Sequence, residues 1–204
     1  MRLVEIELEL PEIAIPADVT QLLTDAKQRI DTLEDKSRAA MPAFVPSDFA
    51  LVYRGLAEIE SARLATGRRF VEWGSGIGAI TCLAMSLGLD AVGIEIEQKL
   101  VDIAEELAAK HAIATQFVCG SFVPCGWESD VVWGTDVAWL TTDGPDAYCE
   151  LELEPDDFDI IFAYPWPGEE QVIFDLFTDC AAMGALLLTY HGIEGVRLQR
   201  KVKR

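Results

Sequence analysis

The feature that most constrains this chain is a glycine-rich turn between an apolar strand and an apolar helix. The segment Glu72-Trp73-Gly74-Ser75-Gly76-Ile77-Gly78 follows the strand-like run Phe70–Trp73 and precedes the helix-like run Ala79–Leu87. Its three glycines let the backbone turn sharply, and they let a ligand lie against the backbone because no Cβ stands in the way. The next helix offers free N–H groups at its first turn. The turn therefore predicts a ligand site at the edge of a sheet.

The same alternation of strands and helices continues along the chain. Apolar runs predict strands at 91–94, 115–119, 158–164 and 185–190. Apolar positions at helical spacing predict helices around 100–107 and over 171–182, and two earlier helices, one over 19–33 and one that begins at a Ser47 cap. This order predicts an α/β fold: a doubly wound, mostly parallel sheet with right-handed crossovers and helices on both faces.

An acidic residue at the end of the second strand narrows the choice of ligand. Glu95 lies 21 residues after Gly74, where a carboxylate can accept hydrogen bonds from two ribose hydroxyls. The ligand is therefore expected to contain adenosine. Gly74, Gly76 and Ala79 also fit the spacing of a dinucleotide-binding turn, so NAD is an alternative. Against NAD, a buried carboxylate at Glu72 suits an ammonium group better than a pyrophosphate.

Two motifs resemble a known family. Glu72-x-Gly74-x-Gly76-x-Gly78 resembles the first motif of class I S-adenosylmethionine-dependent methyltransferases, and Gly93-Ile94-Glu95-Ile96-Glu97 resembles the second. The match covers roughly residues 44–190. It implies a Rossmann-like fold, S-adenosylmethionine as cofactor and a methyl-transfer reaction.

The resemblance also implies roles for individual residues. Glu72 is expected to serve the methionine amino group through water, Glu95 the ribose, and Ile96 the adenine. The family often has an acid that meets the adenine amino group where this chain has Ser121, which can accept a hydrogen bond less strongly. The implied cofactor-binding residues are Glu72, Gly74, Ser75, Gly76, Gly78, Glu95, Ile96, Gly120, Ser121 and Phe122.

The end of the fourth strand borders the transferred methyl group in this family. Members that methylate planar nitrogens have an Asx-Pro-Pro-aromatic tetrapeptide there, whereas this chain has Ala163-Tyr164-Pro165-Trp166, which argues against nucleic-acid base methylation. The candidate catalytic residues are Tyr164, Trp166 and Glu169. Aromatic walls can hold a cation, and Glu169, Glu170 or the Tyr164 phenol can accept a proton from an amine. Alternatively, the aromatic residues are core packing and the glutamates begin a helix, where negative charge is favoured.

Two segments interrupt the alternation. We expect residues 1–43 to form an N-terminal extension of a strand and a helix, followed by a binding domain over 44–204. The strand is predicted by apolar–acidic alternation over Val4–Leu10, and we expect it to pack outside the parallel sheet. Residues 123–157 are expected to be an insertion on the substrate side, with strand-like alternation over 149–154 and tryptophans at 127, 133 and 139. These tryptophans lie either near the acceptor pocket or in the insertion's own core.

Charge and cysteine usage bound the remaining possibilities. The net charge of −19 would repel a phosphate backbone, and it suits cationic substrates or merely solubility. The basic run 197–204 is expected to be a solvated edge strand. The five scattered cysteines form no C-x-x-C pair, so we expect buried reduced thiols and no metal site. No apolar run approaches the roughly 18 residues of a membrane span, and no signal peptide is recognisable, so we expect a cytoplasmic protein.

These observations leave three functional hypotheses. The first is an S-adenosylmethionine-dependent methyltransferase that acts on a nitrogen of a protein or a small-molecule acceptor. The second is an NAD-dependent oxidoreductase that uses the same glycine turn. The third is a non-catalytic module that binds S-adenosylmethionine.

Overall fold

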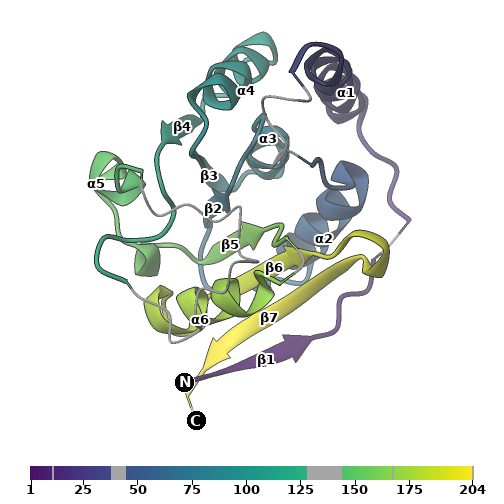
Figure 1. Cartoon of the computed structure of the whole chain (residues 1–204). Coiled ribbons are helices and arrows are strands. Elements are labelled where there is room, and N and C mark those ends of the chain that lie inside the picture. The colour runs from purple at the N-terminus through teal and green to yellow at the C-terminus, as the bar shows by residue number, and fades with distance from the viewer. Residues whose placement is uncertain (11, 38–44, 128–143, 167, 204) are drawn as a thin grey trace.

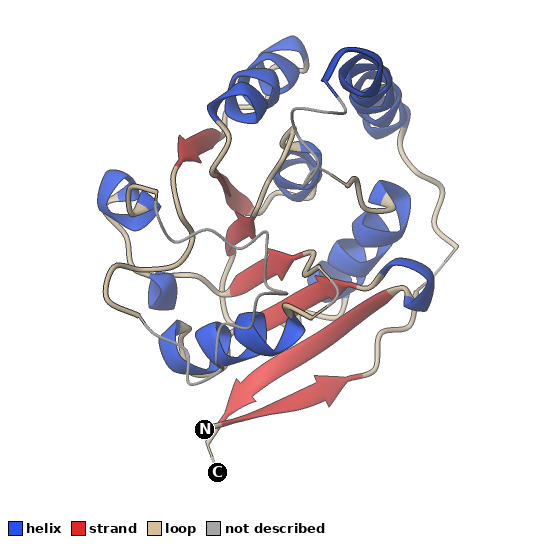
Figure 2. Cartoon of the chain, in the orientation of Figure 1, coloured by secondary structure: helices blue, strands red, loops and turns tan. Residues whose placement is uncertain are grey.

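A seven-stranded sheet runs through the middle of the protein, with helices on both of its faces (Figures 1 and 2). The computed structural model describes residues 1–10, 12–37, 45–127, 144–166 and 168–203. The strands are β1 (Arg2–Ile6), β2 (Arg69–Trp73), β3 (Asp90–Glu95), β4 (Gln116–Cys119), β5 (Ile160–Ala163), β6 (Leu186–Tyr190) and β7 (Val196–Val202). Their order in the sheet is β1-β7-β6-β5-β2-β3-β4. Strands β2 to β6 are mutually parallel and β7 is antiparallel to β6, so the predicted doubly wound, mostly parallel sheet is confirmed.

The helices bury two separate apolar cores against the sheet. The helices are α1 (Ala17–Ser37), α2 (Phe49–Ser61), α3 (Ala79–Ser86), α4 (Gln98–Lys110), α5 (Ala147–Leu151) and α6 (Glu170–Cys180), with short 3₁₀ turns at Pro155–Asp157 and Gly192–Glu194. Helices α1 to α4 share one core with one face of the sheet, and α1 packs on α3 and α4. Helices α5 and α6 share the second core with the opposite face.

The central strand β2 sends its side chains to both cores. Successive residues of a strand point to opposite faces, so Phe70 lies in the core of α1 to α4, whereas Val71 and Trp73 lie in the core of α5 and α6. Strand β2 is flanked by β5 and β3, and the chain changes direction along the sheet between these neighbours. Ligands of such sheets bind at this switch point, outside the carboxyl ends of the strands.

The N-terminal strand belongs to the sheet, which corrects our expectation for Val4–Leu10. Strand β1 ends at Ile6 and pairs antiparallel with β7, Leu3 opposite Lys201. The edge of β7 would otherwise leave backbone donors and acceptors unpaired, and β1 satisfies them.

The basic tail is therefore an internal strand, not the solvated edge strand that we expected. Strand β7 lies between β6 and β1. The side chain of Lys201 is buried, and its Nζ donates hydrogen bonds to the backbone carbonyls of Asp179 and Ala181 at the end of α6.

The alternating segment 149–154 is not a strand, so that prediction is wrong. Residues Ala147–Leu151 form α5, which Asp146 caps by accepting a hydrogen bond from the Tyr148 backbone N–H at 2.9 Å. Ala147 and Tyr148 are buried, and Leu151 lies one helical turn after Ala147, so these apolar residues share a buried face at helical spacing. So short an alternating run fits one helical turn as well as a strand. Trp133 and Trp139 of the predicted insertion lie outside the described residues.

Two smaller expectations also need correction. Helix α2 is capped by Asp48, which accepts a hydrogen bond from the Leu51 N–H at 3.0 Å, and not by Ser47. All five cysteines are free thiols, but only Cys82 is buried, while Cys125 and Cys149 are exposed. Within the described part of the chain, no helix is both long and apolar enough to cross a membrane.

Candidate active site

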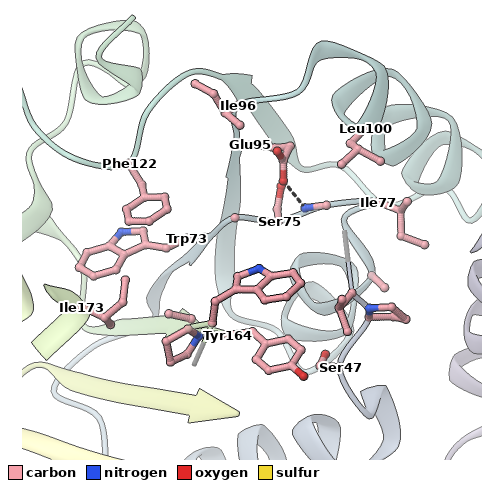
Figure 3. A pocket seen from close by; sticks show the side chains of 18 of the residues that line it. Ser47, Trp73, Ser75, Ile77, Glu95, Ile96, Leu100, Phe122, Tyr164 and Ile173 are labelled. Atoms are coloured by element: carbon pink, nitrogen blue, oxygen red, sulfur yellow. Dashed lines mark hydrogen bonds between the residues drawn. The ribbon is translucent and has the colours of Figure 1, made fainter. Parts of the chain in front are cut away.

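One pocket lies outside the carboxyl ends of β2, β3, β4 and β5, at the switch point of the sheet (Figure 3). It brings together all the sequence segments that the motifs singled out. Its lining is Val45, Pro46, Ser47, Phe49, Trp73, Gly74, Ser75, Gly76, Ile77, Ala79, Glu95, Ile96, Leu100, Gly120, Ser121, Phe122, Ala163, Tyr164, Pro165, Trp166, Glu169 and Ile173. Of the residues predicted from the motifs, only Glu72 and Gly78 are missing from this described lining.

The glycine turn combines a ligand-facing glycine with a packing glycine. Gly74 has a φ of +75°, and a Cβ built on it would meet nothing within 4 Å, so the backbone leaves open space on the pocket side. Gly78 has a φ of +74°, but a Cβ there would lie 2.4 Å from the Phe117 ring. Gly74 therefore leaves room for a ligand, whereas Gly78 lets the glycine turn pack closely against α4 and β4.

Glu95 presents a buried carboxylate to the pocket. Its Oε2 accepts a hydrogen bond from the Gly76 N–H at 2.7 Å (Figure 3), and its Oε1 accepts one from the Glu97 N–H at 3.0 Å. Burial raises the pKa of Glu95 above its ordinary value, and these backbone hydrogen bonds act in the opposite direction. The carboxylate is thus fixed by the turn it faces, with its remaining lone pairs available to hydroxyl donors.

Glu72 holds the first turn of α3. Its Oε2 accepts hydrogen bonds from the Thr81 N–H at 2.8 Å and from the Thr81 hydroxyl at 2.6 Å. Gly78, at the N-cap of α3, has no side chain to supply this contact, so Glu72 satisfies a helix donor from a neighbouring strand. Burial raises the pKa of Glu72 to about 8. Its service to a methionine amino group stays a prediction.

Two serines line the cofactor end of the pocket, and their hydroxyls differ in hydrogen bonding. Ser75 is only 5% exposed, and its hydroxyl has no hydrogen-bond partner among the described residues. The hydroxyl of Ser121 is engaged with its own turn, because it accepts a hydrogen bond from the Val123 N–H at 3.0 Å. Ser75 is therefore the serine whose hydroxyl is poised for a ligand.

An aromatic wall of the predicted Phe122 and of Trp73, which the motifs did not predict, lies on one side of the pocket. The ring of Trp73 stacks on that of Phe122, with a centroid distance of 5.3 Å and an interplanar angle of 7°. The indole N–H of Trp73 donates to the Tyr148 hydroxyl at 2.8 Å. Figure 3 shows Phe122, Trp73 and Ile173 on one side of the pocket, with Ile77 and Leu100 opposite. The signal available in the sequence was the position of Trp73, directly before Gly74 at the end of a strand.

The predicted catalytic residues Tyr164, Trp166 and Glu169 all line this pocket. Tyr164 contacts Tyr190 edge to face at a centroid distance of 4.8 Å, and burial raises the pKa of its phenol. Glu169 is 5% exposed, and its Oε2 accepts a hydrogen bond from the Trp166 N–H at 3.3 Å. Glu170 is not part of the described lining, and its carboxylate accepts a hydrogen bond from the Gly168 N–H instead. The structure thus distinguishes between the two adjacent glutamates.

Residues that precede α2 also line the pocket, although the motifs assigned them no role. Val45, Pro46 and Ser47 lie there together with Phe49 of α2, and Figure 3 shows Ser47 among the lining residues. Trp127, by contrast, is not in the lining, and its indole N–H donates to Asp179 of α6 at 3.1 Å. Of the two alternatives for Trp127, the structure therefore favours a packing role, because the tryptophan packs against the core that α5 and α6 share.

The comparisons with known proteins agree with this geometry. No protein-family model and no curated protein matches the sequence of the chain. Many solved structures are similar in fold, among them three methyltransferases. One is an RNA methyltransferase from Salinibacter ruber in complex with S-adenosyl-L-homocysteine, at 20% identity and a TM-score of 0.51, over 77% of this chain and 92% of the other.

The other two structures extend the likeness over more of the chain. A methyltransferase from Geobacter sulfurreducens is 14% identical with a TM-score of 0.55, over 93% of this chain and 92% of that one. An O-methyltransferase from Bacillus cereus in complex with S-adenosylhomocysteine is 17% identical with a TM-score of 0.53, over 87% of this chain and 67% of that one. The chain therefore has the Rossmann-like fold of S-adenosylmethionine-dependent methyltransferases, as its motifs predicted.

Proposed function

We propose that this protein is an S-adenosylmethionine-dependent methyltransferase that methylates a nitrogen of a protein or a small-molecule amine. The observation that carries the proposal is the composition of one continuous pocket. At one end, the glycine turn and Glu95 suit an adenosine-containing ligand, and at the other end, Tyr164, Trp166 and Glu169 surround a space for an acceptor.

The residues present fit S-adenosylmethionine. Gly74 leaves open space above the turn, the Ser75 hydroxyl has no described partner, and Glu95 keeps lone pairs for ribose hydroxyls. Ile96 and Phe122 flank the same end of the pocket and would hold the adenine. When bound, this cofactor supplies a methyl group that is already activated by a sulfonium, so the protein has to provide position and desolvation.

The acceptor end is suited to these two tasks. Its aromatic side chains exclude water and can attract a cation before reaction. An amine attacks only in its neutral form, and a buried carboxylate can take up the proton that it releases. Glu169 is the carboxylate that lines this end of the pocket, and we assign it this role.

Charge favours an amine over a phosphate-bearing acceptor. Between Lys110 and Arg197 the sequence contains 16 Asp and Glu residues and no Lys or Arg, and this stretch supplies the loops after β4, β5 and β6. Among the described lining residues, Glu95 and Glu169 are acidic, and there is no Lys, Arg or His. A phosphate backbone would meet no cationic contact there, whereas binding of nucleic acid depends on such contacts. The Salinibacter protein is named an RNA methyltransferase, and that acceptor belongs to that protein.

A labelling experiment tests the proposal. The protein is incubated with S-adenosylmethionine carrying an isotopically labelled methyl group and with fractionated cell lysate, and the labelled species is identified by mass spectrometry. We expect the label on an amine nitrogen. A Glu169→Gln protein is the control that shows whether the transfer is enzymatic. A label found only on oxygen or on RNA would contradict the proposed acceptor.

One observation favours a second candidate function. Members of the resembled family that methylate planar nitrogens have an Asx residue at the position of Ala163. The pocket therefore lacks that amide or carboxylate at this position. A module that binds S-adenosylmethionine without transferring its methyl group would show this loss. Tight cofactor binding without labelled product in any fraction would support it.

A further inference from the structure

The turn between β6 and β7 presents a fully exposed isoleucine. Ile193 lies in the short 3₁₀ turn Gly192–Glu194, and its side chain projects entirely into solvent. Backbone hydrogen bonds close the turn, because the His191 N–H donates to the Gly195 carbonyl at 2.7 Å and the Gly195 N–H donates to the Gly192 carbonyl at 3.0 Å. The turn therefore holds the Ile193 side chain outward in an ordered backbone.

This turn adjoins the pocket through Tyr164. A Cβ built on Gly192 would lie 4.0 Å from the Tyr164 hydroxyl, and the Tyr164 ring packs edge to face on Tyr190 at the end of β6. On its other side the turn adjoins α2, since a Cβ built on Gly195 would lie 3.8 Å from the Leu51 side chain (Figure 1). The turn thus lies between a residue that lines the pocket and helix α2.

Other apolar side chains beside the same pocket are also open to solvent. Val45 lines the pocket and is exposed, and Tyr164 and Trp166 line it and are half-buried. We call Val45, Tyr164, Trp166 and Ile193 the apolar rim. A single exposed apolar side chain is ordinary, but several beside one pocket indicate a surface that binds a partner.

The depth of the proposed proton acceptor restricts what can react. Glu169 lines the pocket but is only 5% exposed, whereas Ile193 is fully exposed. An amine that reaches Glu169 while the rest of its molecule contacts the apolar rim needs a long and flexible stem. A lysine side chain has such a stem, and its methylene groups lie readily along apolar and aromatic surfaces while the ammonium group stays at a polar site.

The charges near the turn favour a basic polypeptide. Glu170, Glu194 and Arg197 are the charged groups that act on His191 beside the turn, and Arg197 is paired with Glu194. With Glu169 in the pocket, acidic groups outnumber basic ones here, as they do in the whole stretch between Lys110 and Arg197. Complementary charge steers a basic partner toward such a surface and disfavours an acidic one.

On the basis of the proposed function, we propose that the acceptor is a lysine side chain of a polypeptide, and that Ile193 is a docking contact for the residues that flank this lysine. The lysine ammonium gives one proton to Glu169, and its neutral nitrogen then forms a bond to the methyl group as the bond from that methyl to sulfur breaks. The products are a methylated lysine ammonium and S-adenosylhomocysteine. Because Ile193 only binds the polypeptide, it acts on KM and not on the chemical step.

Separate measurements on macromolecules and on small molecules test the class of acceptor. Cell lysate is divided by dialysis, and each fraction is incubated with the protein and with S-adenosylmethionine that carries a labelled methyl group. We expect the label in the retained fraction, on lysine side chains identified by mass spectrometry, and we expect protease but not ribonuclease to release it. Label in the dialysable fraction alone would overturn the inference and leave the proposed function intact. Cofactor binding without label in either fraction would contradict the proposed function itself.

Ile193→Ser tests the docking contact, with the labelled polypeptide as substrate. The variant removes an apolar contact without adding charge, so KM should rise about tenfold, while kcat and the Kd for S-adenosylhomocysteine stay unchanged. Ile193→Leu keeps an apolar side chain of the same size and should keep KM within about twofold.

Met183→Ser is the matched control for the loss of an exposed apolar side chain. Met183 is exposed in the turn between α6 and β6, at the opposite end of β6 from Tyr190, and it does not line the pocket. Its KM should equal that of the unaltered protein, and neither serine variant should unfold at a lower denaturant concentration. An unchanged KM in Ile193→Ser, or an equal rise in both serine variants, would overturn the docking role of Ile193.

Discussion

The two ends of the pocket are built in opposite ways. At the cofactor end, backbone groups and carboxylates are tied to one another within a short stretch of chain, as in the hydrogen bonds from Gly76 and Glu97 to Glu95. At the acceptor end, side chains from distant segments converge, with Ser47 before α2, Tyr164 after β5 and Glu169 before α6. On the proposed function, the first end holds the cofactor, and the second supplies proton transfer and an apolar enclosure. Variants should therefore separate binding from turnover.

The largest effect is expected at the acceptor end, from Glu169→Gln. The amide keeps an oxygen for the Trp166 N–H but cannot take up a proton, and general base catalysis contributes roughly a hundredfold or more to a rate. We expect kcat for the labelled amine to fall about a hundredfold, while the Kd for S-adenosylhomocysteine stays unchanged. The matched control is Glu170→Gln, which lies outside the described lining. An equal loss of kcat in both variants would show that Glu169 is not the group that accepts the proton.

A second variant, Glu95→Ala, should affect the cofactor end alone. It removes the acceptor for the ribose hydroxyls, and hydrogen bonds to a charged group contribute about 1.5–3 kcal/mol. Cofactor affinity should fall roughly tenfold to a hundredfold, measured by calorimetry. Glu97→Ala is the control, because Glu97 is an exposed glutamate and alanine keeps the backbone N–H that donates to Glu95. Unchanged affinity in a folded Glu95→Ala protein would break the assignment of this end to the cofactor.

Gly74→Ala probes the open space above the turn. Both Gly74 and Gly126 have positive φ, +75° and +82°, and a Cβ on either would meet nothing within 4 Å. Alanine at each site should therefore cost a similar strain of about 1–2 kcal/mol in thermal or denaturant unfolding. Only Gly74→Ala should also weaken cofactor binding, by about tenfold, because only Gly74 lines the pocket. Equal affinities in the two variants would mean that the space above Gly74 holds no ligand.

The smallest effect on ligand binding is expected from Glu72→Gln, which instead changes how stability depends on pH. Burial disfavours the charge of Glu72 and raises its pKa to about 8 in the folded protein, against 4.5 for an ordinary glutamate. Between these pH values the folded state holds a proton that the unfolded state has lost, so stability falls as pH rises through this window. Glu72→Gln keeps an acceptor for Thr81 and has no such proton.

The measurement is the free energy of unfolding of both proteins from pH 5 to pH 9. The difference between Glu72→Gln and the unaltered protein should grow with pH by an amount on the order of a few kcal/mol and level off above pH 8. A difference that is constant with pH would show that the Glu72 carboxyl titrates normally.

The two ends of the pocket also differ in how far the sequence predicts them. Gly74, Ser75, Gly76 and Glu95 are close together along the chain, and the strand–turn–helix pattern that places them is local, so the motif predicts their positions. The role of Trp73 was missed although it adjoins this motif. Side chains alternate along β2, so Trp73 points to the face opposite Glu72, where it contacts Tyr148 and Phe122. Both contacts come from distant segments that the local motif does not encode.

Longer-range features were less predictable for a physical reason. The edge position of β1 depends on pairing with β7 almost two hundred residues away, as Leu3 opposite Lys201 shows, and no local pattern encodes that partner. The alternation over 149–154 fits a strand and a helical turn equally well, and Asp146 together with the burial of Tyr148 decides for α5. In both cases tertiary contacts decide between structures that the local sequence allows.

The central claim is that the pocket binds S-adenosylmethionine, and calorimetry with S-adenosylhomocysteine and with NAD tests it most directly. We predict one-to-one binding of S-adenosylhomocysteine that Glu95→Ala weakens and Glu97→Ala does not, with no heat of binding for NAD under the same conditions. Binding of NAD without binding of S-adenosylhomocysteine would contradict the account and would assign the glycine turn and Glu95 to a dinucleotide.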